Sequence, residues 1–107
     1  MLNDGIIART KREACGLTQS EFGRIIGMSA TQISKYEKGL DVGTIYENAI
    51  KDGLTKIYHE LDEGARYRAH LKSLALRLDY ASATEARDIG LKIITASTKM
   101  EWYLAHR

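Results

Sequence analysis

Apolar residues recur at steps of three and four along most of this 107-residue chain, which is the spacing of amphipathic helices. The pattern is short between residues 22 and 36, and it is much longer in residues 46–61, 67–78 and 86–103. The chain contains no proline, and no Gly/Ser-rich linker separates these segments. The sequence therefore predicts an all-α protein whose helices follow one another through short connections.

The first sharply bounded helix begins at Thr18 and ends at Gly27. Thr18 and Glu21 have the spacing of a capping box, in which each side chain accepts a hydrogen bond from the backbone N–H of the other residue. Phe22, Ile25 and Ile26 then fall at helical spacing on one face of the helix. Gly27 can take the left-handed conformation that ends a helix, because it has no Cβ atom.

A second short helix starts two residues later. Ser29 and Gln32 repeat the capping-box spacing, and Ile33 and Tyr36 give the new helix one apolar face. Gly39 ends it after about ten residues, or roughly 15 Å. Two helices joined by a tight glycine turn form a helix-turn-helix, the arrangement that lays one helix in the major groove of DNA.

Gly23 lies inside the first of these two helices, where glycine costs about 1 kcal/mol relative to alanine. A close approach by the second helix explains a glycine at this position. We therefore expect a bulky residue at position 23 to unfold the unit.

The second helix also has a face outside its apolar stripe. The residues of this face are small, hydrogen-bonding or cationic: Ala30, Thr31, Ser34, Lys35 and Lys38. Such side chains suit a surface that meets base edges and phosphates. A basic set around the motif is expected to face the phosphates: Arg9, Lys11, Arg12, Arg24, Lys35 and Lys38.

Four stretches of this chain carry a family resemblance: GLTQ at residues 16–19, the small Gly23, GMS at residues 27–29 and ISKYEKG at residues 33–39. In these stretches the sequence resembles the lambda-repressor-like (Xre) helix-turn-helix family, without a gap. Residues 6–16 are similar to the first helix of that family. The resemblance covers about the first half of the chain and implies a domain that binds double-stranded DNA.

The resemblance also implies roles for single residues. Gln19 is expected to bond a DNA phosphate, and Glu37 is expected to tie the helix end to its neighbours rather than to read bases. Base contacts are expected from the positions held here by Ala30, Thr31, Ser34 and Lys35, with Ala30 making an apolar contact such as one to a thymine methyl. The predicted DNA-binding residues are therefore Thr18, Gln19, Ser29, Ala30, Thr31, Gln32, Ser34, Lys35 and Lys38.

Three further helices are predicted after Gly39. Thr44 and Glu47 form a third capping-box pair, which opens a helix that ends near Gly64. Apolar residues then mark a helix at positions 67, 71, 74 and 78, and residues 79–83 are expected to form the break after it. Ser82 and Glu85 open a last, long helix with an apolar stripe: Ala86, Ile89, Ile93, Ala96, Met100 and Tyr103.

The last stripe admits two interpretations, which are core packing against residues 71–78 and dimerisation. Because a near-palindromic operator needs two recognition helices about 34 Å apart, a short DNA-binding chain has a physical reason to dimerise. We therefore divide the chain into a DNA-binding domain at residues 1–64 and a helical extension at residues 65–107 that forms a homodimer.

Composition is typical of a small intracellular binding module. The hydrophobic content of 44% suffices for one modest core. The absence of a spanning apolar run and of a signal peptide pattern, together with the single Cys15, favours the cytoplasm. The net charge is +2 for residues 1–39, −4 for residues 40–64 and +4 for residues 65–107.

Enzyme activity is not expected from this sequence. The three histidines, His59, His70 and His106, do not have metal-ligand spacing, and we predict neither a metal site nor a cofactor. Phosphate-binding glycine loops and a nucleophile elbow are also absent.

The sequence thus predicts a transcriptional regulator that binds an inverted-repeat operator. The resemblance favours a dimeric autorepressor of phage or mobile-element type. The alternative is an antitoxin or inhibitor module, whose C-terminal half binds a partner protein and whose helix-turn-helix only regulates its own expression.

Overall fold

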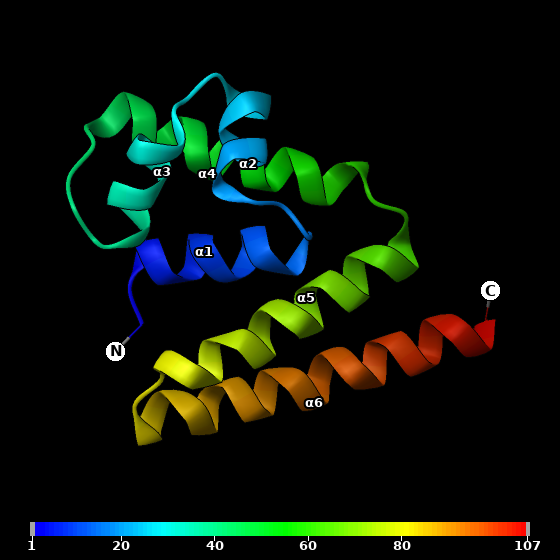
Figure 1. Ribbon diagram of the computed structural model, residues 1–107. Helices are drawn as coiled ribbons and strands as arrows, with labels where there is room; N and C mark the ends of the chain where they lie inside the picture. Colours follow the sequence, from blue (N-terminus) through cyan, green and yellow to red (C-terminus); the bar gives the residue numbers. More distant parts are fainter. Residues whose placement is uncertain (1, 107) are drawn as a thin grey trace.

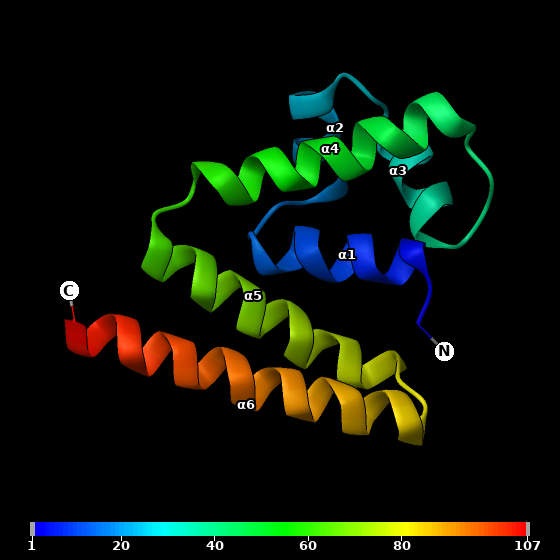
Figure 2. The same cartoon turned by 180° about the vertical axis from the view of Figure 1, so that it is seen from behind.

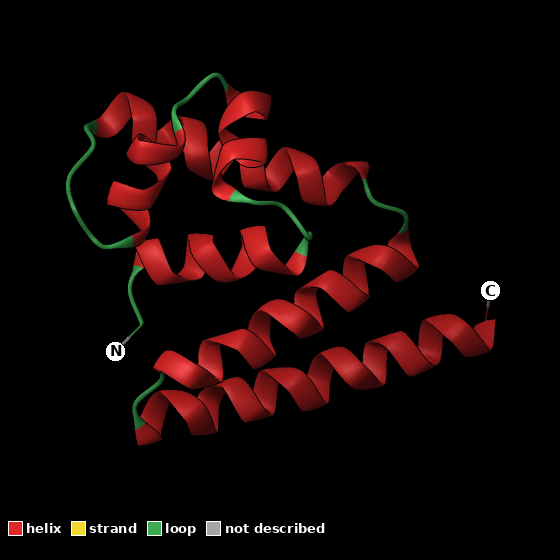
Figure 3. Cartoon of the chain, viewed as in Figure 1, coloured by secondary structure: helices red, strands yellow, loops and turns green. Residues whose placement is uncertain are grey.

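The computed structural model describes residues 2–106, and this part of the chain is helical with no strand. The elements are, in order, α1 (Asp4–Ala14), α2 (Gln19–Ile26), α3 (Ala30–Glu37), α4 (Thr44–Glu60), α5 (Glu63–Arg77), the 3-10 helix η1 (Leu78–Tyr80) and α6 (Ala83–His106). Figure 3 shows that the connections between them are short. The predicted all-α class, with a helix-turn-helix followed by further helices of which the last is long, is confirmed.

Helix α1 lies between two groups of helices (Figure 1). On one side are α2, α3 and α4, and on the other side α5 runs along α1. Helices α5 and α6 then form an antiparallel pair (Figure 2). Figures 1 and 2 also show that α4 lies behind α2 and α3 in one view and in front of them in the other, so α4 covers the back of the helix-turn-helix.

The core of the first group is built from the apolar faces that the sequence pattern predicts. Its buried members come from α1 to α4: Ala8, Phe22, Met28, Ile33, Tyr36, Ile50 and Leu54. Ile33 and Phe22 are fully buried, so α3 and α2 present apolar stripes to one another and to α4. Ile25, predicted on the same face as Phe22, is exposed instead, because the buried face of α2 runs through Phe22, Gly23 and Ile26. This burial fixes the angle at which α3 is held.

The predicted stripe of α6 faces α5. Ile89 and Ala96 are buried there, and the rings of Tyr67 and Tyr103 lie 5.8 Å apart across the two helices. Core packing of this stripe is therefore confirmed. The backbone N–H of Leu2 donates to Glu85 of α6 (3.0 Å), which links the start of the chain to the same pair.

The predicted start of α4 is wrong. Gly43, with φ of +90°, is the N-cap, and no side chain caps the helix. Thr44 is therefore the first helical residue, and Glu47 pairs with Lys51 (3.0 Å) instead of completing a capping box. The helix ends at Glu60, because Asp62 caps a new helix whose first turn contains Gly64.

Smaller differences occur at other helix ends. Helix α1 starts at Asp4 with Asn3 as its N-cap and ends at Ala14, whereas residues 6–16 were expected. Leu78, predicted to continue the apolar stripe of α5, lies in η1 and is exposed, because the chain leaves the α-helix at Arg77. No helix within residues 2–106 has the length and apolarity to cross a membrane.

Candidate nucleic-acid interface

The turn between α2 and α3 has the predicted glycine geometry. Gly27 takes φ of +75°, and the Met28 N–H donates to the Gly23 carbonyl (2.8 Å), which closes the end of α2. Gly23 itself lies directly against the backbone carbonyl of Met28, and a Cβ atom there would also be 3.2 Å from the side chain of Ile33. The close approach expected at Gly23 is therefore confirmed, and the closest contact comes from the backbone of the turn.

Both capping boxes predicted within the helix-turn-helix are present. Thr18 Oγ1 accepts from the Glu21 N–H (3.1 Å), and Glu21 accepts from the Thr18 N–H (3.0 Å). The latter bond lowers the pKa of the Glu21 carboxyl, so it stays ionised. Ser29 and Gln32 form the same pair of bonds at α3, at 3.2 and 3.0 Å.

These caps define where three of the predicted DNA-binding side chains lie. Thr18, Ser29 and Gln32 hold the starts of α2 and α3. Thr18 keeps its hydroxyl proton free and Gln32 keeps its NH₂ free, whereas the Ser29 hydroxyl donates to Gln32 Oε1 (3.3 Å).

The outward face of α3 carries the remaining predicted residues. Thr31, Lys35 and Lys38 are exposed, and Ala30 and Ser34 are half-buried. The opposite face is closed, because its two apolar residues lie in the core. Lys35 and Lys38, and Arg24 on α2, make no ion pair within residues 2–106, so their charges are available to a ligand.

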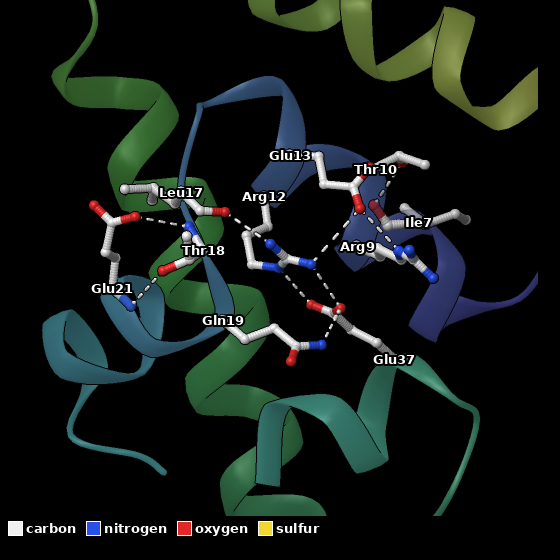
Figure 4. Close-up of polar contacts among 10 residues, drawn as sticks. All are labelled: Ile7, Arg9, Thr10, Arg12, Glu13, Leu17, Thr18, Gln19, Glu21 and Glu37. Carbon is white, nitrogen blue, oxygen red and sulfur yellow. Dashed lines mark hydrogen bonds and ion pairs between the residues drawn. The ribbon is translucent and has the colours of Figure 1, made fainter. Parts of the chain in front are cut away.

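Gln19 is positioned by a buried ion pair that crosses the domain (Figure 4). Its Nε2 donates to Glu37 Oε1 (3.1 Å), and Glu37 is bonded by the Arg12 guanidinium at 2.7 and 3.0 Å. Arg12 also donates to the Leu17 carbonyl (2.7 Å). One guanidinium thus joins α1, the loop before α2 and the end of α3. Glu37 has the structural role that the family resemblance implies.

The expected phosphate-facing role of Arg12 is therefore wrong. Its side chain is buried, and its guanidinium is hydrogen-bonded to Glu37 and to the Leu17 carbonyl inside the protein. Lys11, one residue earlier, lies on the other side of α1 beside α4 and α5. Arg9 is exposed and pairs with Glu13 (2.9 Å). Of the basic set, Arg24, Lys35 and Lys38 lie on α2 and α3 without an internal partner.

No sequence pattern predicted the Arg12–Glu37 pair itself. Its partners are 25 residues apart, and helical spacing does not relate them.

Within residues 2–106, no group of three or more His, Cys, Asp or Glu side chains is placed to hold a metal ion. The surface that the helix-turn-helix offers is thus one of donors, small side chains and unpaired cations.

Comparison with known proteins agrees with this geometry. Residues 9–44 match a family model described as Helix-turn-helix. Searches of curated proteins and of solved structures gave no match. The matched range includes the buried pair, both capping boxes and the glycine turn. Residues 9–44 therefore form a helix-turn-helix domain of the lambda-repressor-like (Xre) type, and such a domain supports a DNA-binding transcription regulator.

Proposed function

We propose that the protein represses transcription by binding a specific duplex sequence with α3. The observation that carries this proposal is the outward face of α3, where small, hydrogen-bonding and cationic side chains stand on a helix fixed by a cap, a turn and a buried ion pair. Side chains of this kind at the start and middle of a recognition helix read base edges in the major groove. Thr31, Ser34 and Lys35 are the proposed readers, with Ala30 against an apolar edge.

Phosphate contacts set the register of α3 in the groove. Gln19 stands at the start of α2, and Glu37 holds only one of its amide N–H groups. The second N–H is free for a phosphate oxygen, and the helix N-terminus adds a favourable dipole. Lys35, Lys38 and Arg24 supply the positive charges on the same two helices.

We further propose that the regulator acts as a homodimer through α6. Leu91, Ile94 and Trp102 are more than half exposed, and their spacing of three and eight residues keeps them on one face. Ile89 and Ala96, on the opposite face, pack on α5. The helix is therefore apolar on two sides, of which one lacks a partner among residues 2–106.

A dimer would place two copies of α3 on successive major grooves, about one helical turn apart. A bound dimer would then exclude polymerase from an overlapping promoter. We propose that a phage or mobile element encodes this repressor and that it acts in the cytoplasm. The same exposed face of α6 also suits the second candidate, an antitoxin or inhibitor that uses it to hold a partner protein.

Selection from a random duplex pool at near-physiological salt tests the proposal. We expect the full chain to recover an inverted repeat with half-sites about one turn apart. Lys35→Ala should weaken binding to the recovered site without lowering Tm, whereas Lys56→Ala, an exposed cation on α4, should leave binding unchanged. Binding that depends on salt but not on sequence would refute specific recognition.

A further inference from the structure

A cavity of about 330 Å³ lies where α4 and α5 both pass α1. Its walls come from these three helices, and none of its lining residues belongs to α2 or α3. Figure 2 shows α1 between α4 and α5, the three helices that line the cavity. The cavity is thus separate from the proposed DNA-reading face.

The lining of this cavity is basic. Lys11 of α1 and Arg66 and Arg77 of α5 contribute three cations, His70 contributes an imidazole, and none of the lining residues is acidic. Lys11 and Arg77 are half-buried. Among residues 2–106, no carboxylate forms an ion pair with any of the three cations.

The internal hydrogen bonds of these cations all go to neutral acceptors. Arg77 donates to the hydroxyls of Thr10 (3.3 Å) and Ser73 (3.1 Å). Arg66 donates to the backbone carbonyl of Leu61 (3.1 Å). Neutral acceptors orient a guanidinium but do not compensate its charge. Arg12 shows the contrast, because its buried guanidinium meets a carboxylate.

Burial and like charge make this site electrostatically unfavourable when it is empty. Burial lowers the pKa of Lys11 and of Arg77, and the charge of Arg77 lowers that of Lys11 further. Burial also raises the pKa of Tyr58 to about 12, so its phenol stays neutral at physiological pH and supplies no counter-charge. A bound anion would remove the repulsion between the two cations.

We propose that the cavity binds a small phosphate-bearing ligand, whose phosphate lies between Lys11 and Arg77 with Arg66 at the rim. A guanidinium and an ammonium together suit a phosphate dianion. The volume is in the range of small-ligand sites, and Leu54 and Tyr58 of α4 supply an apolar wall for the rest of a phosphomonoester. Duplex DNA fits this site less well, since its two deepest cations are half-buried and lie away from α2 and α3.

The ligand would be held by side chains from both sides of the α1–α5 contact. Its binding should therefore stabilise the packing of the C-terminal helices on the DNA-binding domain, by an amount that grows with ligand concentration. This site goes beyond the proposed function, because it requires no operator and no dimer.

Calorimetric titration of the full chain without DNA tests the site. The probes are AMP, adenosine and inorganic phosphate, with potassium chloride matched to equal ionic strength. We expect saturable binding of AMP and none of adenosine. Lys11→Met should weaken the binding at least tenfold, and Arg66→Gln is a second variant at the rim. Lys56→Met, an exposed cation of α4 outside the cavity, is the matched control and should bind as the natural chain does.

Saturable binding of inorganic phosphate with the same dependence on Lys11 supports the site and names free phosphate as its ligand. Stronger binding of AMP than of phosphate supports a phosphomonoester. The proposal is overturned if the binding of AMP disappears once potassium chloride brings all samples to equal ionic strength. It is also overturned if Lys11→Met leaves the binding unchanged. So does a loss of operator affinity in Lys11→Met without any binding of small anions, because the cations would then serve DNA.

Discussion

Arg12 and Glu37 form a two-point ion pair in which Nε and Nη2 of the guanidinium lie 2.7 and 3.0 Å from the two carboxylate oxygens. Both side chains are almost fully buried. The pair joins α1 to the end of α3, and Glu37 also receives the amide of Gln19. The position of the recognition helix and the position of a proposed phosphate contact thus depend on the same carboxylate.

Removing the charge of Glu37 should destabilise the fold. Glu37→Gln leaves the Arg12 guanidinium buried without its counter-charge, which costs about 3–5 kcal/mol. The free energy of unfolding in urea measures the effect. Asp88→Asn is the control, since it removes an exposed pair with Lys92 (3.1 Å) and should cost no more than about 0.5 kcal/mol. Equal losses in the two variants would show that the buried pair has no special weight.

Gly23 and Gly90 offer a matched test of the close approach between α2 and the turn. Both lie inside helices, but a Cβ atom at Gly23 would meet the Met28 carbonyl, whereas nothing lies within 4 Å of one at Gly90. Gly90→Ala should therefore raise the free energy of unfolding by about 0.5–1 kcal/mol. Gly23→Ala should lower Tm, and Gly23→Leu should lower it further. A similar gain in stability from both alanine variants would contradict the packing at Gly23.

A charge on the outer face of α6 should break the proposed dimer. Ile94 is 65% exposed, so Ile94→Asp has little folding cost within one chain. Light scattering should report a dimer for the natural chain at micromolar concentration and a monomer for this variant. Ile45→Asp changes an apolar residue of α4 that is 82% exposed, and it should leave the dimer intact. If Ile94→Asp remains dimeric, the interface lies elsewhere.

Tyr58 should make the fold sensitive to alkali. Burial raises its pKa from 10.0 to about 12, so the unfolded chain loses this proton before the folded chain does. The contribution of the group is fully present below pH 10 and is lost as pH rises from 10 to 12. Tyr58→Phe should flatten the fall in unfolding free energy over this interval. Parallel curves for the two proteins would show that Tyr58 ionises equally in both states.

The sequence was most informative where local chemistry decides the structure. The capping boxes at Thr18 and Ser29 and the turn at Gly27 depend on neighbours within a few residues, and all three were predicted correctly. The stripe through Ile89 and Ala96 was also found, because a helical period needs no knowledge of the partner. At Thr44 the capping-box spacing was misleading, because Gly43, with a positive φ, is the N-cap and Thr44 is already the first residue of the helix.

The residues that sequence patterns misplaced are those whose surroundings depend on how the helices pack together. Arg12 and Lys11 are adjacent cations in one helix, but Arg12 reaches Glu37 of α3 whereas Lys11 lines the cavity beside α4 and α5. Arg12 pairs with a carboxylate 25 residues away, and Lys11 lines the same cavity as Arg77 of α5. No spacing rule relates these pairs, because the packing of α3 and α5 on α1 creates them. The division of the chain at residue 64 and the set of DNA-binding residues stay predictions.

The most direct test of DNA reading by α3 is an NMR titration of the ¹⁵N-labelled full chain with the duplex recovered by selection. We predict that the largest amide shifts fall at the start of α2 and along α3, around Gln19, Thr31, Ser34 and Lys35, while amides lining the cavity between α4 and α5 move little. Shifts confined to α5 and α6, with α3 unperturbed, would contradict the assignment of α3 as the recognition helix.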